Sequence, residues 1–139
     1  LGLEACSRGA RFCLFVEDNA EARAAIRRNV ELLHLTGTTK IWRRDATKLG
    51  EAGTMQPFDL AFLDPPYGKT LGVRALQSAA EGGWIRNGAV AVLEERTDAE
   101  IALPPGFEEI DTRAYGDTKL IVMRAFPVLA GWLGPGGCA

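Results

Sequence analysis

The sequence has little of what several classes of protein require. It holds three cysteines, one histidine and no CxxC pair, so neither a disulfide framework nor a zinc site is expected. No apolar run approaches the ~20 residues that cross a membrane. No basic segment followed by an apolar one marks a secretory signal. The 16 basic residues nearly balance the 18 acidic ones, so the chain lacks the positive charge of a stand-alone nucleic-acid binder.

What is present is the composition of one soluble globular domain. The chain has 139 residues, of which 47% are hydrophobic and 24% are charged, which is ordinary for a folded protein of one domain. This apolar content is enough to offset chain entropy, so disorder is excluded as the main state. We expect a cytoplasmic monomer, with Cys6 and Cys13 as reduced, small core residues.

Strand-like and helix-like segments alternate along the chain. Short apolar runs predict buried strands at residues 12–16, 58–63 and 89–93, with a shorter strand at 40–44. One helix is predicted to begin after the N-cap Asn19 and to stop before Gly37, with an apolar face made of Ala22, Ala25, Ile26, Val30 and Leu33. Further elements are a helical turn within residues 46–52, a helix at 70–81 ended by two glycines, and an antiparallel pair at 107–115 and 119–125.

This alternation predicts an α/β fold with a doubly wound, mostly parallel sheet and a C-terminal antiparallel hairpin. Residues 1–126 are expected to form one domain, and residues 127–139 a tail rich in glycine and proline. No internal repeat and no second domain is visible in the sequence.

Carboxylates follow three of the predicted strands. Glu17, Asp45 and Asp64 each stand where a strand ends, and ligands of open α/β sheets bind at the carboxyl ends of the strands. A surface loop often carries an acid, so one of them alone would mean little. The three together predict one pocket lined by acids, in which such a residue commonly binds ribose hydroxyls.

The most specific motif is Asp64-Pro65-Pro66-Tyr67, directly after an apolar strand. Two prolines fix the backbone and remove two N–H donors, which leaves rigidly placed carbonyl acceptors beside a carboxylate. Such a set of acceptors suits an amino group, which presents only donors. Tyr67 offers a flat face on which a planar base can stack.

This tetrapeptide resembles the (Asp/Asn)-Pro-Pro-(Tyr/Phe) motif of S-adenosylmethionine-dependent methyltransferases that modify exocyclic amino groups. The opening stretch, residues 1–10, is similar to the segment after the glycine-rich loop of RsmD-type methyltransferases. The resemblance covers residues 1 to about 125. It implies a Rossmann-like fold, S-adenosylmethionine as cofactor and methylation of the N2 amine of a guanine in bacterial 16S ribosomal RNA, either free or in a small-subunit assembly particle.

The same resemblance implies roles for individual residues. Glu17 matches the acid that binds the cofactor ribose, and Asp45 matches the position that contacts the adenine amino group. The catalytic loop corresponds to Asp64, Pro65, Pro66 and Tyr67. The other implied cofactor-binding residues are Gly2, Asp18, Asn19, Ala46 and Asp64 itself, and no metal is implied.

One part of the family pattern is lacking. The glycine-rich cofactor loop, the first strand and a basic arm would lie upstream of Leu1, and only Gly2 remains of that region. That first strand would sit between the strands that end at Glu17 and Asp64. Without it buried backbone groups would go unsatisfied, so we expect missing upstream residues or a substitute in the central position.

Two other functions remain open on the sequence alone. A DNA adenine-N6 methyltransferase would share residues 64–67, although no target-recognition domain is visible. A fragment that binds nucleotide or RNA without turnover would fit the lack of a glycine-rich loop. Arg43 and Arg44 are as consistent with RNA phosphate contacts as with a solvated strand edge.

Overall fold

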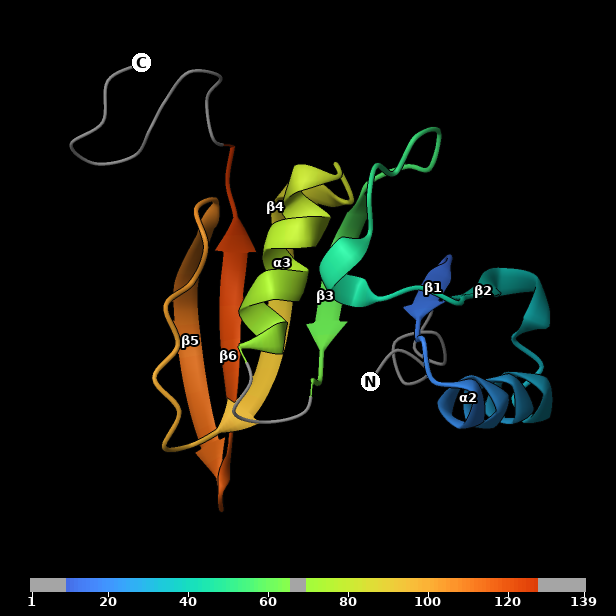
Figure 1. Ribbon diagram of the computed structural model, residues 1–139, viewed down its shortest axis with the longest axis horizontal. Helices are drawn as coiled ribbons and strands as arrows, with labels where there is room; N and C mark the ends of the chain where they lie inside the picture. Colours follow the sequence, from blue (N-terminus) through green and yellow to red (C-terminus); the bar gives the residue numbers. More distant parts are fainter. Residues whose placement is uncertain (1–9, 66–69, 128–139) are drawn as a thin grey trace. The chain divides into compact units, whose positions relative to one another are not determined.

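The structure is a computed structural model that describes residues 10–65 and 70–127. The chain divides into two compact units, residues 1–48 and 49–139. Strands and helices alternate through the first unit and the start of the second, and an antiparallel hairpin follows (Figure 1).

The first unit contains a parallel pair of strands joined by a helix. Its elements are β1 (Cys13–Val16), α2 (Ala20–Leu32), a 3-10 helix at Thr36–Thr38, β2 (Thr39–Trp42) and a second 3-10 helix at Ala46–Lys48. Val16 pairs with Trp42 in the parallel ladder, so the carboxyl ends of the two strands lie side by side. The predicted strands, helix and helical turn are all confirmed, with ends that differ by at most four residues.

Asn19 begins α2 as the sequence predicts. Its backbone is extended, and its side-chain oxygen accepts a hydrogen bond from the Ala22 N–H at 2.9 Å, which satisfies one of the donors that a helix start leaves free. Val30 is buried as expected. Leu33 is half exposed, contrary to the prediction, because the helix ends at Leu32 and Leu33 is already its C-cap.

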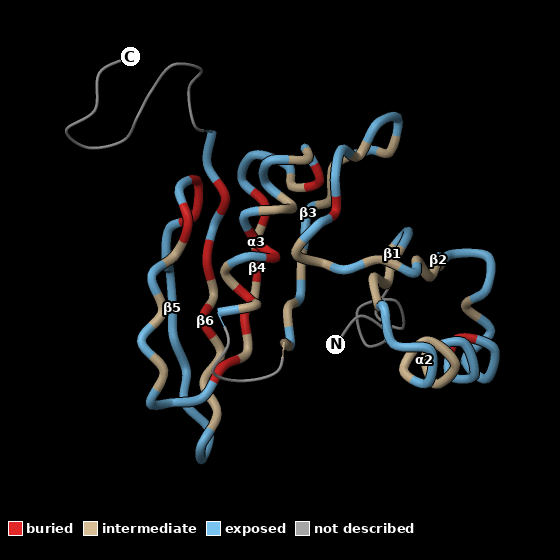
Figure 2. The backbone as a smooth tube through the Cα atoms, in the orientation of Figure 1, coloured by how far each residue is buried: buried red, intermediate tan, exposed pale blue. Residues whose placement is uncertain are grey.

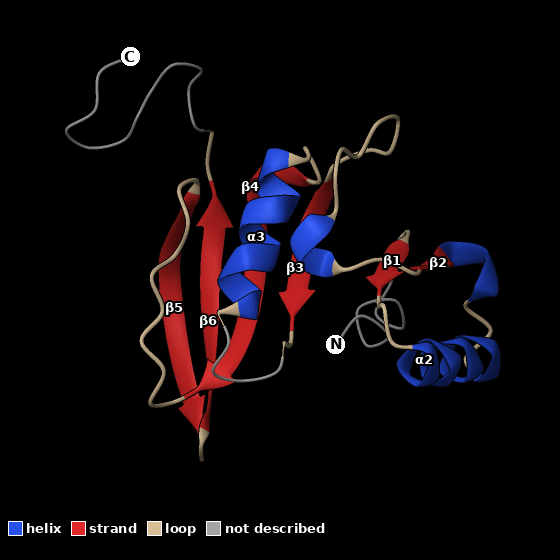
Figure 3. Ribbon diagram, in the orientation of Figure 1, coloured by secondary structure: helices blue, strands red, loops and turns tan. Residues whose placement is uncertain are grey.

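The second unit is a four-stranded sheet with one helix packed on it. Its elements are β3 (Phe58–Leu63), α3 (Leu71–Glu81), β4 (Ile85–Arg96), β5 (Phe107–Tyr115) and β6 (Thr118–Ala125). The strand order is β3-β4-β6-β5, in which β3 and β4 are parallel and the other neighbours antiparallel. Figure 3 shows this sheet in red with α3 in front of it. The predicted α/β class and the closing hairpin are confirmed.

β4 is longer than the predicted strand 89–93. Residues Glu94, Glu95 and Arg96 continue it by pairing with the start of β6. An apolar run in the sequence marks the buried part of a strand, whereas this polar end is held by backbone pairing that only the partner strand supplies.

The strands pair in two separate sheets. β1 pairs with β2, and β3 pairs with β4, and no ladder joins β1 to β3 within the described residues. β1 and β3 are the strands that end at Glu17 and Asp64. The sequence analysis placed the family's first strand, upstream of Leu1, between these two strands. The single-domain boundary at residue 126 stays a prediction, and positions 128–139 of the expected tail lie outside the described residues.

The core of the second unit lies between α3 and one face of the sheet. Leu76, Leu93 and Met123 are its largest fully buried side chains. Figure 2 shows the buried positions concentrated along α3, β4 and β6. The close fit of α3 depends on Gly72, since a Cβ at this position would lie 2.4 Å from Cδ1 of Leu93 and 3.2 Å from Cγ of Pro65.

The opposite face of the sheet carries the alternate residues. Leu60 and Phe62 of β3 are 44% and 36% exposed, and they pair with Val90 and Val92 of β4. Because successive side chains of a strand point to opposite faces, Asp64 and Glu94 continue this partly exposed face beyond the core pair Leu63 and Leu93.

Two further findings concern cysteine and the membrane. Cys13 is disulfide-bonded and only partly buried, so the prediction of a reduced core residue is wrong; an odd cysteine count without a CxxC motif does not exclude one bridge. Cys6 and Cys138 lie outside the described residues. No helix within the described ranges is long and apolar enough to span a bilayer.

Substituting Gly72 tests the packing of α3. Alanine favours a helix more than glycine does, yet Gly72→Ala should lower the free energy of unfolding by about 1–3 kcal/mol because its methyl group overpacks against Leu93. Urea unfolding measures the change. Gly37→Ala is the control, because nothing lies within 4 Å of the added Cβ. A Gly72→Ala protein as stable as the control would contradict this account.

Candidate functional site

Glu17 extends the parallel ladder by one residue beyond β1. Its N–H donates to the carbonyl of Trp42 at 3.0 Å, which fixes the backbone at the strand end. One carboxylate oxygen, Oε1, accepts a hydrogen bond from the Asn19 N–H at 3.1 Å. No described residue donates to the other oxygen, so Glu17 keeps an acceptor at the carboxyl end of the strand.

Asp18 and Asn19 form the turn from β1 into α2. Both are exposed. The guanidinium of Arg23 donates to the carbonyls of Asp18 at 2.8 Å and Glu17 at 3.3 Å. Arg23 therefore holds the turn from the first part of the helix. The sequence pattern gives no sign of this role, because the contact depends on how the turn folds back.

Asp45 organises the turn after β2. Its Oδ1 accepts hydrogen bonds from the Thr47 N–H at 2.9 Å and the Thr47 hydroxyl at 2.7 Å, and its carbonyl accepts from the Lys48 N–H. Ala46 starts the 3-10 helix that follows. Because β1 and β2 are parallel neighbours, the loops that carry Glu17 and Asp45 leave the same edge of this sheet. The structure thus brings two of the three predicted acids together in the first unit.

A basic and aromatic cluster borders Asp45. The Arg44 guanidinium lies 4.4 Å from the centre of the Trp42 ring, and the Lys40 ammonium lies 5.4 Å from it. These are cation–π distances. Arg43 is exposed. Arg44 therefore packs on Trp42. The sequence analysis had predicted either RNA phosphate contacts or a solvated strand edge for Arg44, and neither prediction included this packing.

The second unit carries the described part of the catalytic loop. Asp64 follows the paired residue Leu63 and is exposed, while Pro65 is partly buried near the first turn of α3. Thr70 has the left-handed backbone conformation, with φ 53°, which costs about 1–3 kcal/mol for a residue other than glycine. Pro66 and Tyr67 lie outside the described residues, as does Gly2.

Glu94 lies beside Asp64 and was not among the predicted site residues. Leu63 of β3 pairs with Leu93 of β4, so the next residue on each strand points the same way. A hydrogen bond to Asp64, followed by burial and by the negative charge of Asp64, raises the pKa of Glu94 above its ordinary value of 4.5. The rule that acids at strand ends mark the site would have found Glu94 in the sequence.

Glu95, unlike its partly exposed neighbour Glu94, is a buried acid. It is 2% exposed, and the Arg96 N–H donates to its Oε1 at 3.2 Å. Since it alternates with Glu94 along β4, it faces the side covered by α3.

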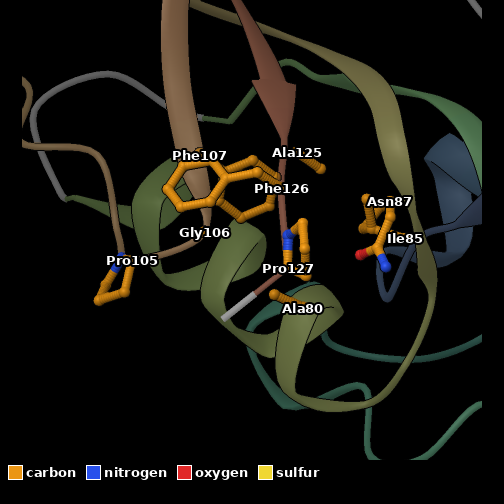
Figure 4. Close-up of a pocket in the computed structure, with 9 residues that line it drawn as sticks. All are labelled: Ala80, Ile85, Asn87, Pro105, Gly106, Phe107, Ala125, Phe126 and Pro127. Atoms are coloured by element: carbon orange, nitrogen blue, oxygen red, sulfur yellow. The ribbon is translucent and has the colours of Figure 1, made fainter. Parts of the chain in front are cut away.

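A cavity of about 320 Å³ lies at the other end of this sheet, shown in Figure 4. It is lined by apolar side chains together with Asn87 near the amino end of β4 and Pro105, Gly106 and Phe107 at the start of β5. Asp64 and Glu94 lie at the carboxyl end of β3 and β4, and neither of them lines this cavity. Across residues 10–65 and 70–127 there is no cluster of three His, Cys, Asp or Glu side chains suited to a metal.

Comparison with known proteins agrees with the order of these elements. The family model described as conserved hypothetical protein 95 matches residues 1–124. The chain belongs to this family. The resemblance to RsmD-type methyltransferases is thereby confirmed, because relatives of the chain carry that name.

Two curated relatives illustrate the family. An uncharacterized methylase from Rickettsia prowazekii is 34% identical over 67 residues, which are 48% of this chain and 28% of that protein. Ribosomal RNA small subunit methyltransferase D from Haemophilus influenzae is 25% identical over 118 residues, which are 84% of this chain and 61% of that protein. The chain thus spans less than two thirds of the length of either relative.

A solved structure shows the same fold. A protein from Haemophilus influenzae superposes with a TM-score of 0.79 at 22% identity, over 91% of this chain and 80% of that one. At this identity the likeness concerns the fold alone.

The raised pKa of Glu94 predicts a pH-dependent stability. The folded protein holds the Glu94 proton more tightly than the unfolded chain, so the resulting stability is fully present below the ordinary pKa of 4.5 and is lost as the pH rises through the raised pKa. Glu94→Gln cannot ionise. The free energy of unfolding of the wild type relative to Glu94→Gln should therefore fall over this interval, measured by urea unfolding at a series of pH values. Glu108→Gln on exposed β5 is the control, and a flat difference for Glu94→Gln would rule out the effect.

Proposed function

We propose that the protein transfers a methyl group from S-adenosylmethionine to an exocyclic amino group of a base in ribosomal RNA. The observation that carries this proposal is the Asp64-Pro65-Pro66-Tyr67 sequence at the carboxyl end of β3, the strand parallel to β4. Membership of the family and the names of its curated relatives support it.

The acceptors of the first unit fit the nucleoside part of the cofactor. Glu17 has a carboxylate oxygen to which no described residue donates, and a carboxylate at this position suits ribose hydroxyls, which can donate to it. Asp45 would accept from the adenine amino group, with the Ala46 backbone beside it. Gly2, Asp18 and Asn19 complete the proposed cofactor-binding residues, together with Asp64. The Asn19 side-chain oxygen already caps α2, which leaves its amide group for a ligand.

The chemistry divides between the cofactor and the chain. S-adenosylmethionine supplies a methyl group that is already activated by its positive sulfur. The weak nucleophile is the amine, whose lone pair is shared with the base ring. Asp64 and the Pro65 carbonyl accept hydrogen bonds from this amine, which favours a pyramidal nitrogen and aims its lone pair.

The same acceptors stabilise the positive charge that develops on nitrogen during transfer. The transfer would form a C–N bond in place of the S–CH₃ bond and would release one amine proton, which the Asp64 carboxylate would accept. Positioning and charge stabilisation carry the reaction, and general-base catalysis is secondary. The base leaves its stack to reach the loop, and Tyr67 supports it there.

The proposed target is the N2 amine of a guanine in 16S ribosomal RNA, free or in a small-subunit assembly particle. The name of the Haemophilus influenzae relative supports a small-subunit RNA substrate. A labelled-cofactor assay on RNA, on DNA and on small-subunit particles distinguishes this target from DNA adenine. Cofactor binding without transfer to any of them would favour the non-catalytic alternative.

Asp64→Ala tests the catalytic loop in the whole protein. We expect loss of methyl transfer, by about 100-fold or more, with a much smaller loss of cofactor affinity, because Asp64 is only one of the proposed cofactor-binding residues. Transfer of labelled methyl groups and calorimetry with S-adenosylhomocysteine measure the two effects. Asp59→Ala is the matched control, because Asp59 is an exposed acid of the same strand whose partner is Arg86. Wild-type turnover by Asp64→Ala would overturn the assignment.

Glu17→Ala should weaken cofactor binding more than it affects methyl transfer. Loss of the ribose acceptor is expected to weaken the binding of S-adenosylhomocysteine by about tenfold or more, since a hydrogen bond to a charged group contributes ~1.5–3 kcal/mol. Glu31→Ala on the exposed face of α2 is the control. If calorimetry gives both variants the wild-type affinity, Glu17 does not bind the cofactor.

A further inference from the structure

Asp64 stands where the regular structure of β3 ends. It is exposed, and the residue after it begins the proline pair. A carboxylate in this position has several side-chain conformations to choose from, and ordering it costs conformational entropy. The proposed reaction needs that carboxylate in one orientation, toward the amine.

Glu94 lies in a more constrained setting. It belongs to β4, which is paired on one side with β3 and on the other with β6, where its partner is Leu120. The register of Leu63 with Leu93 places Asp64 and Glu94 next to each other on the face of the sheet opposite α3.

From this geometry we propose that Glu94 is a positioning residue for Asp64, donating a hydrogen bond that holds the Asp64 carboxylate in its working orientation. The inference rests on the proposed function and deepens it. Glu94 touches neither substrate nor cofactor in this role, so it acts through Asp64 alone.

The donor role requires a proton on Glu94. Two ionised carboxylates side by side repel each other, whereas one shared proton turns the contact into a short, charge-assisted hydrogen bond. The raised pKa of Glu94 is consistent with this arrangement. The amine proton released on methyl transfer goes to Asp64 and then to water, while Glu94 retains its own.

The charges around Glu94 point to the same pair. From β3 the facing group is Asp64. On β6 the residue opposite is the uncharged Leu120, and the ammonium of its neighbour Lys119 donates to the Ala99 carbonyl. Glu95 lies on the other face of the sheet, toward α3.

Kinetics of two Glu94 variants in the whole protein test the proposal. At a pH below the pKa of Glu94, Glu94→Ala should lower kcat about tenfold while KM for RNA stays within about threefold, because orientation contributes to the transition state and not to substrate binding. Glu94→Gln keeps a donor and should retain kcat within about threefold. Glu108→Ala, an exposed acid on β5, is the control and should match the wild type.

The pH profile separates positioning from a merely structural role. In the wild type kcat should decline as the pH rises through the pKa of Glu94, since the ionised side chain no longer donates to Asp64. Glu94→Gln, whose amide donates at every pH, should lack this decline. Wild-type kcat in Glu94→Ala, or the same decline in Glu94→Gln, overturns the proposal.

A titration independent of activity keeps the inference testable if a variant folds poorly or the reaction differs from the one proposed. Carboxyl carbon NMR of the wild type should give Glu94 a pKa above 4.5, and Asp64→Asn should bring it down by removing the negative neighbour. An unchanged Glu94 pKa overturns the pairing. Absence of methyl transfer by the wild type, with the titration as expected, would instead overturn the proposed function.

Discussion

The parallel register of β3 and β4 is the constraint on which the second unit depends. Leu63 and Leu93 are paired in that register, and Leu93 is fully buried beneath α3 because Gly72 lets the helix approach. The same contact brings α3 against Pro65. One packing arrangement therefore fixes the end of β3 and the start of the helix relative to each other.

The alternation of side chains along β3 and β4 places two acids together on one face of the sheet. The side chains of Leu63 and Leu93 point into the core, and the next ones, Asp64 and Glu94, point to the opposite face. The register of β3 and β4 is enough to place Asp64 and Glu94 next to each other. The sheet that stabilises the second unit thus also aligns the carboxyl groups of Asp64 and Glu94.

In the first unit, hydrogen bonds order the ends of the strands. Its parallel pair is short, and few of its side chains are buried. Order at the strand ends comes instead from the ladder bond of Glu17, the N-cap of Asn19, the Arg23 contacts and the Asp45 turn. Apart from the ladder bond to Trp42, these hydrogen bonds span two to six residues, so sequence patterns such as an N-cap can reveal part of them.

The sequence by itself determined the elements, because helical and strand periodicity, an N-cap at Asn19 and turn glycines are local properties. It also determined the residues at the strand ends and the family to which Asp64-Pro65-Pro66-Tyr67 points. Only the tertiary structure decided the polar extension of β4 and the pairing of Asp64 with Glu94. These features depend on which strand lies next to which and in what register, and such long-range pairing is not written in the local spacing of residues.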